Sequence, residues 1–128
     1  MITVGIIVSA VVAFVASSSY YALMTPLEQR VLGEAAMDRG RPQTWKVLTE
    51  LARTAVVAIA FAWIASHTQL GSLPGTLTLG AVLWAGFPLV LLTGSVIWER
   101  VPPITAAIHA GDWLIKLLLL AVILGLLH

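Results

Sequence analysis

Long uncharged stretches alternate with short polar segments along this chain, a pattern typical of a protein that crosses a membrane several times. Residues 2–24 carry no charge, and neither do residues 54–98. The second stretch is too long for one crossing, which takes about 20 residues. Polar and turn-forming residues at 67–75 divide it into two helices. The pattern therefore predicts membrane helices at about 2–24, 43–66, 76–98 and 104–127.

Prolines indicate where these helices begin, end and bend. Pro26 should end the first helix, because a proline disfavours helical geometry in the residue before it. Pro42 suits the first turn of the second helix, and Pro88 should kink the third. The first apolar stretch is too long for a cleaved signal peptide and has no basic start, so we expect a retained helix. Residues 31–37 carry a weak pattern for a short interfacial helix.

The composition excludes most functional classes. Only 10% of the residues are charged and 59% are hydrophobic, whereas about 25% are charged in an ordinary soluble domain. Such a chain cannot cover a water-soluble surface, and it is too apolar to be disordered. It has no cysteine and a formal net charge of +1, so we expect neither a thiolate site nor a nucleic-acid partner. The sequence predicts one all-α domain over residues 1–128, an integral membrane four-helix transmembrane bundle in a lipid bilayer.

Basic residues predict how the bundle is oriented. Arg30, Arg39 and Arg41 lie in the first loop and Arg100 lies in the third, while the second loop and both termini carry no Lys or Arg. Cytoplasmic loops are enriched in Lys and Arg. We therefore expect the first and third loops in the cytoplasm and both termini outside.

Helices two and four are too short unless they include charged residues. Their uncharged parts span only about 18 Å and 16 Å at 1.5 Å per residue, so both must extend through polar turns. Because an isolated charge in the bilayer costs from about 2.5 to more than 10 kcal/mol, we expect these groups to face the bundle interior. The expected pairs are Glu50 with Lys116 and Asp112 with Arg53. The candidate ligand or proton site is Glu50, Arg53, His109, Asp112 and Lys116.

Other polar and aromatic residues fall in the same half of the predicted bundle, whereas the opposite half is almost entirely apolar. This asymmetry suggests a polar cavity that opens to the cytoplasm and is closed on the outside. The residues expected to line it are Ser17, Tyr20, Tyr21, Trp84, Thr93, Glu99 and Trp113.

The same residues admit other interpretations. A buried charge network can hold helices in register and do nothing else. His109 with Asp112 or Glu50 could bind zinc, but with one histidine in the spans we expect no metal and no cofactor. A serine from 17–19 could form a Ser-His-Asp set with His109 and Asp112, but the sequence carries no local catalytic signature, so we expect no enzyme.

Small residues recur at every fourth position of the first helix, at Gly5, Ser9, Ala13 and Ser17. Such ridges let membrane helices approach closely. They suit packing inside the bundle or a homodimer, and both alternatives remain open.

Several motifs resemble a known family. They are Tyr20-Tyr21-Ala22-Leu23-Met24-Thr25-Pro26, Trp84-Ala85-Gly86-Phe87-Pro88, Trp98-Glu99, and Ile108-His109-Ala110-Gly111-Asp112-Trp113 leading into Ala121-Val122-Ile123-Leu124-Gly125. With these motifs the chain resembles small four-helix bacterial membrane proteins of the domain of unknown function 1761 family. This chain has His109 where the family often has Asn, and Asp112 directly after the glycine. The resemblance implies four helices in a bacterial inner membrane and supplies no activity.

The sequence thus predicts a small bacterial inner-membrane protein whose charged site binds or translocates a small solute or a proton, as a homo-oligomer. The alternative is an accessory or scaffold subunit of a larger membrane complex, in which the charge network is purely structural. An enzyme that acts on lipid ranks last.

Overall fold

The computed structural model describes residues 2–33 and 44–127, and its regular elements there are helices. They are α1 (Ile2–Leu32), α2 (Thr44–His67), α3 (Leu73–Gly86), α4 (Pro88–Trp98) and α5 (Pro103–Leu126). Because α3 and α4 form one span, the described chain has four segments long and apolar enough to cross a membrane. The predicted all-α membrane bundle is confirmed.

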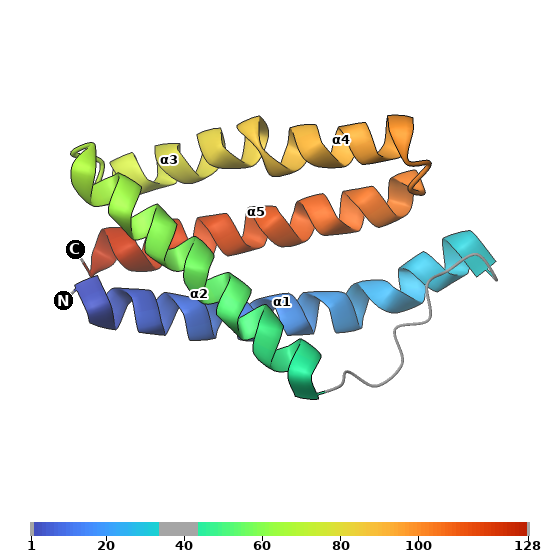
Figure 1. The fold of residues 1–128 in the computed structure, drawn as a ribbon, viewed down its shortest axis with the longest axis horizontal. Helices are drawn as coiled ribbons and strands as arrows, with labels where there is room; N and C mark the ends of the chain where they lie inside the picture. Colours follow the sequence, from blue (N-terminus) through green and yellow to red (C-terminus); the bar gives the residue numbers. More distant parts are fainter. Residues whose placement is uncertain (1, 34–43, 128) are drawn as a thin grey trace.

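Helix α5 is the central element of the bundle. It lies between α1 on one side and α3 with α4 on the other, while α2 crosses the bundle diagonally, and the two chain ends lie at the same end (Figure 1). The core contains Phe61 of α2 together with Leu120 and Ala121 of α5. Ser9 and Ala13 are fully buried, so the small ridge of α1 packs inside the bundle.

Helix α1 does not end at Pro26, and the prediction that it does is wrong. The helix continues to Leu32 with Pro26 inside it. Proline removes one backbone hydrogen bond, and membrane helices tolerate this where side chains satisfy the backbone nearby. The carbonyl that Pro26 leaves without its helical donor is that of Ala22, and one residue before it the Thr25 hydroxyl donates to the Tyr21 carbonyl at 2.6 Å. The extension also gains a contact with α5, because Thr105 Oγ1 donates to Oε2 of the fully buried Glu28 at 2.8 Å.

The predicted kink at Pro88 is confirmed. The helix is interrupted at Phe87, where φ is −123° and ψ is −77°, and this break separates α3 from α4. The ends of α2, of the α3–α4 span and of α5 lie within about three residues of the expected ones. Most of the weakly predicted interfacial helix at 31–37, and Arg39 and Arg41 of the first loop, lie outside the described residues.

Candidate functional site

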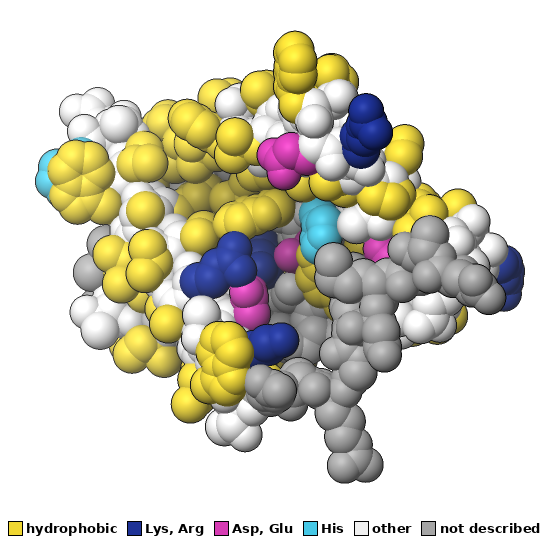
Figure 2. Space-filling view, turned by 45° about the vertical axis from the view of Figure 1, so that its right-hand side comes forward, with side chains coloured by type: hydrophobic (Ala, Val, Ile, Leu, Met, Phe, Trp, Pro, Cys, Tyr) yellow, Lys and Arg dark blue, Asp and Glu magenta, His cyan; other side chains and the backbone are white. Residues whose placement is uncertain are grey.

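A cavity of about 670 Å³ lies between α1, α2 and α5, with Leu92 of α4 at its edge. Figure 2 shows cationic, acidic and histidine side chains around a hollow in an otherwise largely apolar face. All the predicted ligand or proton site residues line this cavity: Glu50, Arg53, His109, Asp112 and Lys116. The tertiary structure therefore brings together two helices that are distant in the sequence.

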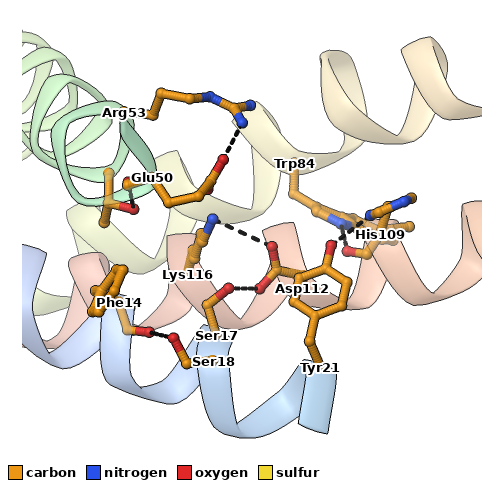
Figure 3. A network of polar contacts seen from close by, with 12 residues as sticks. Phe14, Ser17, Ser18, Tyr21, Glu50, Arg53, Trp84, His109, Asp112 and Lys116 are labelled. Carbon is orange, nitrogen blue, oxygen red and sulfur yellow. Dashed lines mark hydrogen bonds and ion pairs between the residues drawn. The ribbon is translucent and has the colours of Figure 1, made fainter. Parts of the chain in front are cut away.

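A buried ion pair on α5 forms one wall of the cavity. Asp112 is 3% exposed and Lys116 is 7% exposed, and Lys116 Nζ lies 3.3 Å from Asp112 Oδ2. Ser17 Oγ of α1 donates to Asp112 Oδ1 at 2.5 Å, as Figure 3 shows. Lys116 Nζ also lies 5.2 Å from the centroid of the Trp113 ring. Both carboxylate oxygens thus have partners, which offsets the cost of burying the charge.

A second ion pair belongs to α2 and is more accessible. Arg53 donates to Glu50, and their side chains are 64% and 45% exposed, respectively. In Figure 3 this pair faces the α5 pair across the cavity.

The predicted pairs between helices, Glu50 with Lys116 and Asp112 with Arg53, are wrong. Each carboxylate pairs with a cation on its own helix, three or four residues further on. Such spacing brings side chains together on any helix, whereas α2 crosses the bundle at an angle and makes little contact with α5.

His109 belongs to a separate polar contact. Its Nδ1 lies 2.5 Å from the Tyr21 hydroxyl, and the two ring centroids are 5.6 Å apart. Of the three serines at 17–19 considered for a Ser-His-Asp set, Ser17 donates to Asp112 directly, so the His109 imidazole does not lie between this serine and the carboxylate. Over the described residues, no group of three or more acidic or histidine side chains could hold a metal ion.

Three of the residues predicted to line the site do so: Ser17, Tyr21 and Trp113. Thr93 and Glu99 do not. Thr93 is exposed and donates back to the Leu89 carbonyl at 2.7 Å, and Glu99 is exposed beyond the end of α4. These two predictions are wrong because Thr93 and Glu99 lie on the exposed side of α4, whereas Leu92 is its residue in the cavity wall.

Tyr20 and Trp84 do not line the cavity either, so that part of the prediction is wrong, but both contact the segment of α5 that forms its wall. The Tyr20 ring lies over Gly111, so that a Cβ at this glycine would be only 3.2 Å from Tyr20 Cζ. Trp84 Nε1 donates to the Ala110 carbonyl at 2.8 Å, which ties α3 to α5. Both residues position the segment of α5 that carries His109 and Asp112.

The sequence prediction missed several lining residues. Lys46 precedes Glu50 by four residues, so their shared helix face could have identified it as part of the site. Thr54 follows Glu50 at the same spacing and donates to the Glu50 carbonyl at 2.9 Å. Ser18 and Thr25 line the α1 side, and nothing in their local sequence indicates which face of α1 meets α5.

A family model described as "Protein of unknown function (DUF1761)" matches residues 4–125, which confirms the resemblance seen in the aromatic and glycine motifs. No curated protein and no solved structure matches the chain.

Proposed function

Because the chain belongs to this family of proteins of unknown function (DUF1761), we propose its role from the cavity itself. The protein binds or moves a small solute or a proton in a bacterial inner membrane, and it is not an enzyme. The observation that carries this proposal is the buried Asp112–Lys116 pair in the wall of a cavity of about 670 Å³.

The cavity is suited to a small ligand by size and chemistry. Ligand sites commonly enclose about 300 to 1,000 Å³ with mostly apolar walls and a few polar groups. Here Phe14, Val47 and Leu92 are apolar, and the two ion pairs offer both donors and acceptors. Ionisable residues inside a membrane span usually belong to substrate paths or proton relays.

The predicted orientation in the membrane indicates to which side of the bilayer the cavity opens. The cavity lies at the end of the bundle where α2 and α5 begin, and the first and third loops are at this end. The positive-inside rule then makes it open to the cytoplasm, with both termini outside. In a homo-oligomer, a second copy would cover the outward surface of α4, which has no fully buried residue and leaves Leu91 69% exposed.

A non-enzymatic role agrees with the hydrogen bonds of the site. Ser17 donates to Asp112, and a serine nucleophile would need a neighbouring base that accepts its proton, such as an imidazole. His109 instead contacts Tyr21.

The test uses Asp112→Asn combined with Lys116→Gln, which removes both charges without leaving one unpaired. The purified protein is screened by thermal shift with acetate, phosphate, glycine and methylammonium. Proton flux is followed in proteoliposomes that contain a pH-sensitive dye. We expect one of these responses in the natural protein and a loss of at least tenfold in the double variant. Arg100→Gln, which changes an exposed cation outside the cavity, is the matched control and should respond normally.

A chain without any response to these solutes or to protons would contradict the proposal, as would a response that the double variant retains.

A second candidate is an accessory or scaffold subunit of a larger membrane complex. It is favoured by the complete pairing of Asp112, whose two oxygens are bound by Ser17 and Lys116. A purely structural pair predicts that the folded double variant keeps its cellular role. Co-purification of a stoichiometric partner at native expression would favour this candidate.

A further inference from the structure

The α2 and α4 sides of the cavity wall do not pack against each other. No Cα atom of α2 comes within 8 Å of one of α4, although both helices belong to the membrane spans. Leu92 of α4 lies at one edge of the cavity, and Lys46, Glu50 and Arg53 of α2 lie at the other. A molecule dissolved in the bilayer could therefore reach the charged groups without passing through water.

The α2 side of the cavity carries a surplus of positive charge. Lys46, Glu50 and Arg53 follow one another at spacings of four and three, so they share one helix face. Glu50 pairs with Arg53, and among the ion pairs of the described residues none involves Lys46. Arg53 is 64% exposed, about 14 Å from the start of α2 at 1.5 Å per residue. If this part of α2 lies in the hydrocarbon, an exposed cation there is stabilised by an anion that lies in the bilayer with it.

An apolar groove continues from the charged cavity. It has a volume of about 370 Å³ and shares Glu50, Arg53, Thr54, Trp113 and Lys116 with the cavity. Beyond these residues its walls are mostly aliphatic, with Ala52, Val56 and Val57 of α2 and Leu120 of α5, and Thr49 of α2 adds one hydroxyl. The two hollows together form a charged compartment joined to a hydrocarbon-lined one.

We propose that the ligand is an acidic amphiphile that enters from the bilayer between α2 and α4. Its anionic head binds at Arg53 and Lys46, and an acyl chain lies in the groove along Ala52, Val56 and Val57. This inference rests on the proposed function and specifies its ligand. The shared chemistry is a carboxylate or phosphate ester on a hydrocarbon chain, so either a bilayer phospholipid or a free fatty acid satisfies it.

The full chain, purified in detergent, is incubated with phosphatidylglycerol, phosphatidylcholine or palmitate, and the retained molecules are counted by native mass spectrometry. We expect phosphatidylglycerol or palmitate to be retained about tenfold more strongly than phosphatidylcholine, a difference of about 1.4 kcal/mol. Retention of phosphatidylglycerol would identify the ligand as a bilayer phospholipid, and retention of palmitate would identify it as a free fatty acid. Arg53→Gln should lower this retention about tenfold, whereas Arg100→Gln, on a cation outside both hollows, should not.

A second variant tests the groove. Ala52 is exposed and lines it, so Ala52→Trp should fill the groove and reduce retention of palmitate without disturbing the core. Ala60→Trp is the matched control, because Ala60 is also exposed on α2 but lines neither hollow.

The proposal of an acidic amphiphile would be overturned if phosphatidylcholine were retained as strongly as phosphatidylglycerol and palmitate. It would also be overturned if Arg53→Gln and Arg100→Gln retained these ligands equally. If acetate, glycine or protons still give a response that depends on Asp112 and Lys116, the proposed function stands and only this inference fails. If neither amphiphiles nor these probes bind, both fail.

Discussion

At the scale of single residues, the Asp112–Lys116 pair is the feature on which the site depends. Asp112 Oδ2 lies 3.3 Å from Lys116 Nζ, and both side chains are more than nine-tenths buried. The free-energy cost of burying each charge is offset only while its partner is present, because the two charges stabilise each other.

The single substitution Asp112→Asn should therefore destabilise the protein more than the double substitution with Lys116→Gln. The single variant leaves a buried cation without its partner, which typically costs about 3 to 5 kcal/mol. Thermal unfolding in detergent, followed by circular dichroism, measures the difference in a double-mutant cycle. Additive effects in that cycle would mean that the two side chains are not coupled.

At the scale of helices, small residues determine how closely α3 approaches α5. A Cβ at Gly125 would lie 2.8 Å from Leu73 Cα of α3, too close for any real contact. Thr76 of α3 donates to the Ala121 carbonyl of α5 at 2.6 Å, and this bond requires the same close approach.

Gly125→Ala should thus move α3 away from α5 and cost about 1 to 3 kcal/mol, as overpacking usually does. Gly94→Ala is the matched control, because nothing lies within 4 Å of a Cβ there and alanine favours a helix by about 1 kcal/mol over glycine. Midpoints of thermal unfolding compare the two variants. A Gly125→Ala midpoint equal to or above that of Gly94→Ala would show that the contact can relax.

At the scale of the whole molecule, the cavity should admit water although the bundle is embedded in lipid. The chain has no cysteine, so a single introduced thiol reports its own surroundings. Ser18→Cys places a thiol in the cavity wall. Val15→Cys places one on the same helix at a position that is 57% exposed and lines neither hollow.

A water-soluble, membrane-impermeant maleimide should label Ser18→Cys and leave Val15→Cys unlabelled, because the reactive thiolate does not form in hydrocarbon. Mass spectrometry of vesicles treated from one side measures both yields. Labelling from the side of the first and third loops would agree with the proposed orientation, and no labelling of Ser18→Cys from either side would contradict a hydrated cavity.

The sequence by itself determined the membrane class, the number of spans and the break at Pro88. These features follow from local properties: apolar length against bilayer thickness, and the missing backbone N–H of proline. It also placed His109, Asp112 and Lys116 on one face, because helical spacing is periodic.

Only the tertiary structure decided which helices meet and at what angle. The diagonal path of α2 leaves Glu50 paired with Arg53 instead of Lys116, and it keeps α2 from packing against α4. Likewise, the polar pattern around Glu28 predicts a loop. In the structure α1 continues through this residue, and Glu28 is buried in contact with Thr105 of α5. Crossing angles and such distant contacts depend on side chains that pack together from separate segments, and no local pattern in the chain encodes them.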